Sequence, residues 1–350
     1  MKPLQRILDT AARSDRRIAL PEGEDPRVVE AAVAAARGGI ARITLLGDAA
    51  TIRSRLASAG GEESERIEIR DPAASPITGR LAELYLRLRA HKGLTETEAL
   101  EGARAPAIHA ALSVRAGLAD GTLGGATLPT AVIVRTAIQI IGMAPESRMV
   151  SSFFLMMCCA SHHAKNGAYV FADAGLVIDP TADEMAEIAI ASARSYAELT
   201  GEVPRVAMLS FSTHGSAQHG AVSKVVEATA IAKARCRNLI IDGELQFDAA
   251  FVPDVAFAKA KGSPLGGDAN VFVFPSLEAG NIGYKIAQRL GGAEAIGPIL
   301  QGLAKPANDL SRGCSAEDVL HMIAVTAAQA DGMAEPIARM PELATEISPK

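Results

Sequence analysis

The sequence has no excess of basic charge. Of its 350 residues, 35 are lysine or arginine and 40 are aspartate or glutamate, which gives a net charge of -5. Clusters of basic residues interleaved with aromatic ones, the usual footprint of nucleic-acid binding, are also missing. The composition therefore argues against a nucleic-acid partner. A site for an anion would have to be local, built from a few arginines or lysines.

Cysteine is scarce, and none of it is arranged to hold a metal. The four cysteines are at positions 158, 159, 236 and 314. They form no CxxC pair, and no histidine completes a zinc-ligand spacing. The first residues, MKPLQRILDTAARSDRR, lack the apolar core of a secretory leader. Free thiols suit a reducing compartment, so we expect a cytoplasmic protein without a bound metal.

Long apolar runs are missing as well. The two most apolar stretches are TLPTAVIVRTAIQIIGMA, which contains Arg135 and Gln139, and SSFFLMMCCA. The second is only ten residues long, whereas a membrane-spanning helix needs about 20. We expect both to be buried elements of a protein without a membrane partner. The second stretch is predicted to be a core strand or a subunit contact.

Three signatures of common active sites are absent too. The sequence contains no Walker loop and no GxGxxG fingerprint, so a nucleotide bound by either device is not indicated. It also contains no GxSxG elbow, and no histidine lies near Ser311 in the chain. A Ser/His/Asp hydrolase therefore has no support.

The sequence does contain two series of alternating strands and helices. In the first, RIAL, RITLL and RIEIR are predicted strands, and Asp25 is predicted to cap the helix after RIAL. The second series follows Pro145, with the strand patterns YVFADAG, RVAMLSF, NLIID and NVFVF. Repeated units of this kind form parallel sheets covered by helices. We predict an α/β fold of two lobes, each a mostly parallel sheet flanked by helices in three layers, with a cleft between them. Residues 1–145 plus 297–350 are predicted to form the first lobe and residues 146–296 the second.

One short segment, KPANDLSRGCSAEDVL, combines polar and reactive side chains before an apolar helical pattern. Ser315 followed by Asp318 matches a capping box, so Ser311 and Arg312 should lie just ahead of a helix N-terminus. Such an end favours anions, and an arginine fork suits phosphate. The alternative is an ordinary capped turn in which Asp318 only caps, Arg312 only pairs with a surface acid and Cys314 only packs.

Several long stretches resemble phosphate acetyltransferases, also called phosphotransacetylases. They are RIALPEGEDPRVVEAA, FADAGLVIDPTADEMAEIA, AMLSFSTHGSA, DGELQFDAAFVP and ANVFVFPSLEAGNIGYKIAQRLGGAEAIGPILQGLAKPANDLSRGCSAEDV. The resemblance covers essentially the whole chain. It implies reversible acetyl transfer, acetyl-CoA + phosphate ⇌ CoA + acetyl phosphate, in a homodimer of two-lobed subunits. Coenzyme A is then a substrate, and no tightly bound cofactor is expected.

The resemblance also implies the site residues. Asp318 falls on the family's base, and Ser311 and Arg312 complete the catalytic set. Substrate binding is expected from Arg135, Arg89, Cys314, Ser212, Thr213, Tyr284 and Lys285. The sequence departs from the family pattern at Ala90 and His214, where lysines are usual, and at Val132, where an acid is usual.

The expected chemistry is attack of the CoA thiolate on an acyl phosphate held by positive charge. Arg312, Arg135 and Arg89 are the predicted anion clamps. The alternative for Arg135 is a structural salt bridge or a snorkelled stem. Ser311 is predicted to hydrogen-bond the thiol or the oxyanion. An acyl group carried by Cys314 is the less favoured route, since no base for it is visible. A butyryl or other short-acyl transferase, a non-catalytic CoA-binding module and a two-lobed dehydrogenase remain alternatives.

Overall fold

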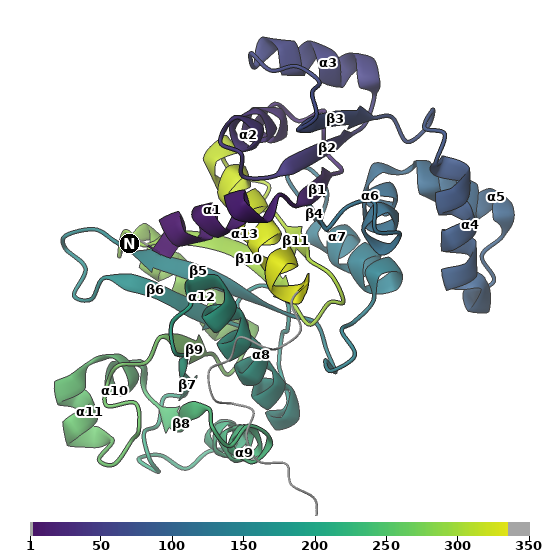
Figure 1. Cartoon of the computed structure of the whole chain (residues 1–350). Helices are drawn as coiled ribbons and strands as arrows, with labels where there is room; N and C mark the ends of the chain where they lie inside the picture. Colours follow the sequence, from purple (N-terminus) through teal and green to yellow (C-terminus); the bar gives the residue numbers. More distant parts are fainter. Residues whose placement is uncertain (1–2, 335–350) are drawn as a thin grey trace, which may run out of the picture.

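The computed structural model describes residues 3–334 and contains two β-sheets, each covered by helices (Figure 1). The first sheet has five parallel strands in the order β11-β4-β1-β2-β3. Their bounds are β1 (Arg17–Leu20), β2 (Arg42–Leu46), β3 (Ile67–Arg70), β4 (Gly121–Gly124) and β11 (Ala307–Asp309). The strands predicted at RIAL, RITLL and RIEIR are confirmed. β11 joins this sheet from the far end of the chain.

Helices cover both faces of the first sheet. On one face α13 contacts α1, α2, β1 and β4, and on the other α6 contacts β1 and β4. Asp25 caps α2 as predicted, because its side chain accepts from the N–H of Arg27. The helices of this lobe are α1 (Pro3–Ser14), α2 (Pro26–Arg37), α3 (Ala49–Ser58), α4 (Thr78–Arg89), α5 (Glu96–Arg104), α6 (Pro106–Arg115), α7 (Thr130–Thr136) and α13 (Ala316–Ala334), with a 3₁₀ turn at Ala90–Lys92 and a π-helical segment at Ala137–Ile141.

The second sheet has six strands in the order β10-β5-β6-β9-β7-β8. Three of its pairings are parallel, but β5 pairs antiparallel with both β6 and β10. The sheet is therefore mostly parallel, as predicted, with an antiparallel edge that the sequence patterns did not indicate. Its strands are β5 (Ser151–Cys158), β6 (Gly167–Ala172), β7 (Arg205–Leu209), β8 (Ile240–Leu245), β9 (Val271–Val273) and β10 (Glu294–Gln301).

The run SSFFLMMCCA supplies β5, and its side chains alternate between the two faces of the sheet. Phe153, Leu155 and Met157 belong to the core under α8, whereas Phe154 and Met156 pack under α12. A strand that is covered on both faces is apolar throughout. Of the two predicted roles, core strand is confirmed. The helices of this lobe are α8 (Ala182–Thr200), α9 (Gly220–Arg235), α10 (Phe247–Phe251), α11 (Pro253–Lys259) and α12 (Leu277–Arg289).

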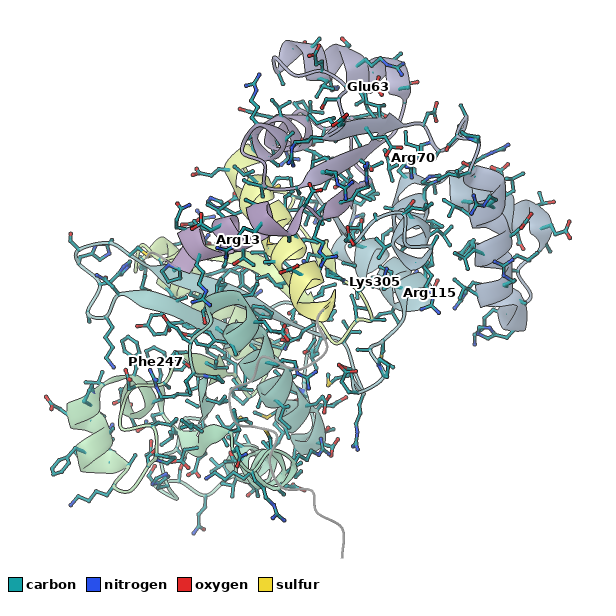
Figure 2. All side chains as sticks on the ribbon, viewed as in Figure 1. Arg13, Glu63, Arg70, Arg115, Phe247 and Lys305 are labelled. Atoms are coloured by element: carbon teal, nitrogen blue, oxygen red, sulfur yellow. The ribbon has the colours of Figure 1, made fainter. Side chains whose placement is uncertain are left out.

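Aromatic rings fill the space between the second sheet and α10. Figure 2 shows Phe247 at the start of this helix, and its ring centroid lies 5.1 Å from that of Phe272 in β9. Phe171 in β6 meets Phe272 edge-on at 5.6 Å. Such offset and edge-on arrangements are the favourable ones for aromatic pairs. Arg13 and Glu63, labelled in the same view, are exposed.

The end of the chain connects the two lobes. β10 lies at the edge of the second sheet, β11 follows at the edge of the first, and α13 then packs on α1, α2 and α8. The lobe boundary expected at residue 297 falls inside β10, because the turn signal at Gly297 and Pro298 belongs to an irregularity within the strand, where the register shifts between Ile296 and Ile299. No helix among residues 3–334 is long and apolar enough to cross a membrane.

Candidate active site

The Ser311 loop lies between β11 and α13, and a capping box closes it. Asp318 Oδ2 accepts hydrogen bonds from the backbone N–H and the hydroxyl of Ser315, both at 2.8 Å. The N–H of Asp318 donates to Ser315 Oγ at 3.1 Å. The predicted capping box is therefore confirmed. Ser311 and Arg312 are exposed just ahead of it, at the helix end that favours an anion.

Arg27 fixes the backbone of this loop. Its Nη1 donates to the carbonyl oxygens of Arg312 at 2.8 Å and Cys314 at 3.0 Å. Its Nη2 donates to the carbonyl oxygen of Ala126 at 2.9 Å and to Asp25 Oδ2 at 2.8 Å. The hydrogen bond from Arg27 keeps the pKa of Asp25 below its usual value, although burial works against this. One guanidinium thus ties together the starts of α2 and α13 and the loop after β4.

Glu22 shapes the loop after β4 in a similar way. Its carboxylate, which is only 8% exposed, accepts from the backbone N–H groups of all four residues 125–128, at 2.7–2.8 Å. The hydroxyl of Thr127 donates to it at 2.7 Å as well. A carboxylate with several backbone donors is strongly held. The loop that it holds leads into α7, the helix that carries Arg135.

The two other predicted anion clamps are on α7 and α4. Arg135 is exposed on α7 between buried neighbours, and Arg89 is half-buried at the end of α4. Among residues 3–334, neither guanidinium comes within ion-pair distance of a carboxylate. The helix turns the side chain of Arg135 outward, while Ile133 and Val134 face the core. Both arginines have their donors available.

Cys314 is buried behind the loop. Its Sγ lies 3.8 Å from Arg27 Nη1. Burial raises the pKa of the thiol, and the positive charge of Arg27 only partly opposes this shift. A thiol in these surroundings stays protonated at neutral pH and is a poor nucleophile. The geometry thus favours packing as the role of Cys314.

Ser212 and Thr213 lie in the second lobe, in the loop after β7, and their hydroxyls are used within it. Ser212 Oγ donates to Glu244 Oε1 at 2.9 Å, and Thr213 Oγ1 accepts from the N–H of Gln246 at 2.9 Å. Both side chains are buried. His214, at the position where a lysine is usual, places its Nε2 3.1 Å from Asp242 Oδ2. This loop is therefore internally bonded.

Tyr284 and Lys285 are on α12, also in the second lobe. The ring of Tyr284 stacks on Phe154 with centroids 3.9 Å apart, and Lys285 donates to Asn281 one turn earlier at 2.8 Å. In the described part of the chain, no hydrogen bond joins Ser212, Thr213, Tyr284 or Lys285 to the Ser311 loop. The structure thus brings Ser311, Arg312, Cys314 and Asp318 together in one loop. It places the other predicted site residues, Ser212, Thr213, Tyr284 and Lys285, in the other lobe.

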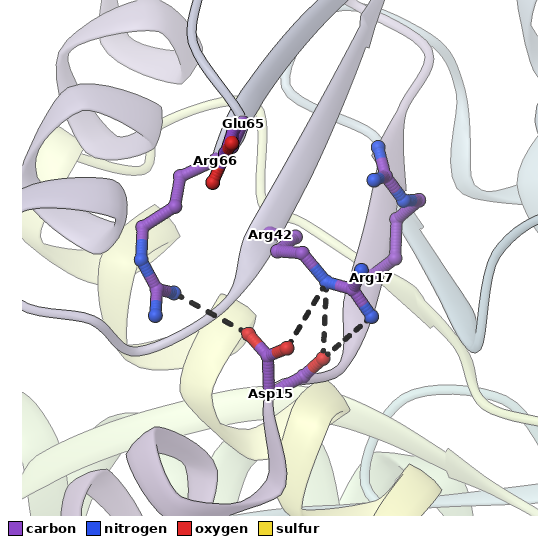
Figure 3. Close-up of a pocket in the computed structure, with 5 residues that line it drawn as sticks. All are labelled: Asp15, Arg17, Arg42, Glu65 and Arg66. Atoms are coloured by element: carbon purple, nitrogen blue, oxygen red, sulfur yellow. Dashed lines mark hydrogen bonds and ion pairs between the residues drawn. The ribbon is translucent and has the colours of Figure 1, made fainter.

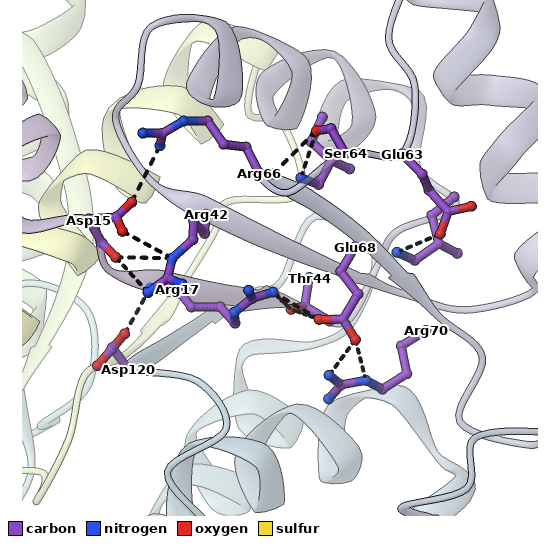
Figure 4. Close-up of polar contacts among 12 residues, drawn as sticks. Asp15, Arg17, Arg42, Thr44, Glu63, Ser64, Arg66, Glu68, Arg70 and Asp120 are labelled. Carbon is purple, nitrogen blue, oxygen red and sulfur yellow. Dashed lines mark hydrogen bonds and ion pairs between the residues drawn. The ribbon is translucent and has the colours of Figure 1, made fainter.

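A charged pocket of about 470 Å³ lies elsewhere, at the starts of β1, β2 and β3 (Figure 3). Asp15 sits there between Arg42, at 3.4 Å, and Arg66, at 3.5 Å. Arg17 points away to Glu68 Oε2 at 2.8 Å (Figure 4). Ligands of parallel sheets bind at the carboxyl ends of the strands, where the Ser311 loop is, so we assign this pocket to a structural ion-pair network.

Sequence reasoning did not identify Glu22, Arg27 or Asp309 as parts of the site. The first two are in RIALPEGEDPRVVEAA, where Arg27 looks like an ordinary first-turn residue of a helix. Their contacts join segments about 100 and 285 residues apart, so no local spacing could reveal them. Within residues 3–334 there is no group of three or more metal-ligating side chains.

Comparison with known proteins defines the class first: this chain of two α/β lobes is an acyltransferase. It belongs to the Phosphate acetyl/butaryl transferase family, whose model matches residues 3–327. The phosphate acetyltransferase of Paracoccus denitrificans is 52% identical over 329 residues, which cover 94% of this chain and 99% of that protein. The phosphate acetyltransferase of Acetivibrio thermocellus is 46% identical, with 94% and 98% covered. A solved phosphotransacetylase from Streptococcus pyogenes superposes with a TM-score of 0.87 at 43% identity, over 94% of this chain and 98% of that one.

Proposed function

We propose that the chain transfers an acetyl group between coenzyme A and phosphate, acetyl-CoA + phosphate ⇌ CoA + acetyl phosphate. The observation that carries this proposal is the Ser311 loop. Its Ser311 and Arg312 are exposed at the N-terminus of α13, and Arg27 fixes its backbone from below. Coenzyme A is a substrate in this scheme, and no tightly bound cofactor is needed.

In the proposed mechanism the thiolate of CoA attacks the acyl phosphate directly, in a ternary complex. Arg312, with Arg135 and Arg89, binds the phosphoryl group, and Ser311 donates to the developing oxyanion. Asp318 takes the thiol proton through Oδ1, because both hydrogen bonds from Ser315 go to Oδ2. The protonated, buried state of Cys314 supports direct attack over an acyl-enzyme on that residue.

The second lobe is proposed to bind the body of CoA. We assign this contact to the loop with Ser212 and Thr213 and to Tyr284 and Lys285. Lys285 and the edge of Tyr284 offer a charge and a ring on one helix. The hydroxyls of Ser212 and Thr213 hold their loop in shape, so these two would act through the backbone that they position.

A direct assay tests the reaction. Purified protein is mixed with acetyl phosphate and CoA, without NAD or ATP, and thioester formation is followed by absorbance. Propionyl and butyryl phosphate are run in parallel, because the family name covers both acetyl and butyryl transfer. Absence of turnover with every C2–C4 acyl phosphate would leave the non-catalytic CoA-binding module as the better interpretation.

Arg312 gives the second test of the same site. Arg312→Ala should lower kcat/KM, and the decrease should correspond to a loss of about 2–5 kcal/mol of transition-state stabilisation. This is the usual effect of removing a charged group that binds a substrate. Arg53→Ala is a matched control, since Arg53 is an exposed arginine paired with Glu63 far from the loop. A decrease within threefold for Arg312→Ala, in a protein that melts normally, would mean that Arg312 is an ordinary surface residue.

We also propose a homodimer, with the exposed face of α12 as the contact. Ile282, Ile286 and Leu290 are 58%, 53% and 84% exposed, and their spacing of four residues places them in one stripe. An exposed apolar stripe of this kind usually marks an interface. Light scattering should give twice the chain mass, and Ile286→Asp should give the monomer. A monomeric unmodified protein at micromolar concentration would contradict the proposal.

Two further assignments are proposals. Residues 3–145 with 302–334 would form one folding unit and residues 146–301 the other, because each group builds one sheet. Limited proteolysis should then cut first in the exposed connection at residues 145–148. The free cysteines 158, 159, 236 and 314 support a reducing, cytoplasmic location, and detection of the protein in a secreted fraction would contradict it.

A further inference from the structure

Asp309 is a buried carboxylate that the proposed mechanism does not use. It ends β11, two residues before Ser311, and is 1% exposed. Its Oδ2 accepts from the hydroxyl of Thr130 at 2.6 Å, but its Oδ1 is buried without a hydrogen-bond partner in the described part of the chain. An unpartnered buried carboxylate oxygen is costly.

The surroundings of Asp309 favour its neutral form. Burial raises the pKa of the carboxyl to about 6; the hydrogen bond from Thr130 opposes this shift, and the nearby carboxylate of Glu22 adds to it. At neutral pH the fold therefore holds a carboxylate in a place where an amide would fit at lower cost. Titratable side chains whose charged form is poorly stabilised by the fold are found more often at functional sites than elsewhere.

The hydrogen bond between the Asp309 side chain and Thr130 joins two parts of the site. Thr130 is the first residue of α7, which carries Arg135 on its outer face. On the other side, Leu310 donates to the carbonyl oxygen of Gly124 at 2.7 Å, which fixes the strand that leads into the loop with Ser311 and Arg312. The contact between Asp309 and Thr130 thus ties the start of α7 to the strand that leads into the loop with Ser311 and Arg312.

Gly125 shows how closely these parts meet. Its φ of +112° lies in the region that favours glycine, and a Cβ at this position would stand 2.3 Å from Asp309 Oδ1. No side chain could be inserted between the β4 loop and the carboxylate. The loop held by Glu22 and the end of β11 are therefore in direct contact.

We propose that Asp309 is a positioning residue for the phosphoryl substrate, which acts through Thr130 to hold α7, and with it Arg135, in place beside the loop that carries Arg312. The proposal rests on the acyl-transfer function proposed above. Two guanidinium groups that face the same phosphoryl group bind it well only at the right separation, since each contact is directional. Without the hydrogen bond between Asp309 and Thr130, binding of acetyl phosphate and phosphate should therefore weaken, and CoA binding should stay nearly unchanged.

The test uses four variants of the full chain. Asp309→Ala removes the acceptor for Thr130, and Asp309→Asn keeps an acceptor without the charge. Thr130→Val removes the donor. Thr229→Val is a control for the loss of a threonine hydroxyl away from the site: Thr130 is exposed, whereas Thr229 is buried in α9 of the other lobe, where it donates to the carbonyl oxygen of Val225. KM for acetyl phosphate, KM for CoA, kcat and melting temperature are measured for each from pH 6 to pH 9.

For Asp309→Ala and Thr130→Val we expect KM for acetyl phosphate to rise at least tenfold, with KM for CoA within threefold. Asp309→Asn should keep KM for acetyl phosphate within threefold of the value for the unmodified protein. It should also remove any change in this KM between pH 6 and pH 7 that comes from ionisation of Asp309. The control should leave every KM unchanged. A KM for acetyl phosphate within threefold in both Asp309→Ala and Thr130→Val would overturn the proposal, as would an Asn variant as impaired as the Ala variant.

Calorimetric titration with inorganic phosphate separates this inference from the proposed function. If the unmodified protein shows no turnover but binds phosphate, the acyl-transfer proposal fails, and a tenfold weaker Kd in Thr130→Val still supports the positioning role. If the unmodified protein binds no phosphate, both proposals fail. A simple structural role for Asp309 predicts a different pattern, in which melting temperature, both KM values and kcat all worsen together.

Discussion

Replacing Asp318 by asparagine separates its two possible contributions, capping α13 and accepting the thiol proton. In the structure Oδ2 takes two hydrogen bonds from Ser315, and Oδ1 takes none of them. An asparagine can keep its carbonyl oxygen in the Oδ2 position, but it loses the negative charge that strengthens both hydrogen bonds. We therefore expect Asp318→Asn to lower the free energy of unfolding by about 0.5–2 kcal/mol, as for other caps.

The catalytic effect should be larger. A free thiol titrates near ~8.5 and a free aspartate near ~3.9, so complete proton transfer to Asp318 is uphill by roughly 6 kcal/mol. The proton should therefore move to Oδ1 as the sulfur attacks. Because an amide cannot accept it, kcat of Asp318→Asn should fall by ~10²–10⁴.

Ser315→Ala is the matched control. It removes the hydroxyl that donates to Asp318 and accepts from its N–H, yet it leaves the carboxylate in place. Thermal melting should show a similar decrease in stability, about 1 kcal/mol, whereas kcat should stay within threefold. If Ser315→Ala and Asp318→Asn lower kcat by the same factor and shift the melting temperature alike, the carboxylate serves the helix and the reasoning is refuted.

Three further predictions concern groups around the loop. Arg27→Met removes the donors to two loop carbonyls, and each of these hydrogen bonds contributes about 1.5–3 kcal/mol to stability. We therefore expect kcat/KM to drop at least tenfold. An unchanged kcat/KM in steady-state kinetics would show that Arg27 is not needed to hold the loop. Burial lowers the pKa of His321, but the contact with Glu294 at 2.9 Å and two carboxylates on the same helix raise the pKa overall. Protonated His321 therefore stabilises the folded state. This stabilisation is fully present below the usual pKa of histidine and is lost as pH rises through the raised pKa. Urea unfolding should therefore show His321→Gln less stable than the original at pH 6 and nearly equal at pH 9, and an equal decrease at both would contradict the pairing. Iodoacetamide at pH 7.5 should label exposed Cys159 before Cys314, and Cys314→Ala should keep kcat within threefold; mass spectrometry and the thioester assay check both.

The sequence predicted those parts of the fold that depend on local patterns. The strand at Arg17–Leu20 and the helix behind Asp25 have the predicted bounds because strand alternation and caps act within a few residues. The antiparallel edge of the second sheet could not be predicted in this way. β10 pairs with β5 across more than 130 residues, and nothing in either strand alone states its partner or its direction.

The same distinction between local patterns and long-range contacts applies to the site. The capping box of Ser315 and Asp318 is a local pattern and was predictable, and so was the exposed Ser311 ahead of it. The roles of Glu22 and Asp309 were not, because each depends on a loop brought close by the fold. Arg135 was predicted as an anion clamp from the cost of an arginine among apolar neighbours, and the structure places it exposed on α7.

The order in which the chain is synthesised gives a special place to its last described segment. β10 and β11 are edge strands of different sheets, and α13 packs on α1 and α2 of one lobe and on α8 of the other. Neither sheet can be complete before residues 294–334 have left the ribosome. Until then the nascent chain exposes the open side of β4 and the apolar faces of α1 and α2, surfaces that invite aggregation or chaperone binding. Folding should therefore finish late and in both lobes at once, and the loop with Ser311 and Arg312 would form in that same final step.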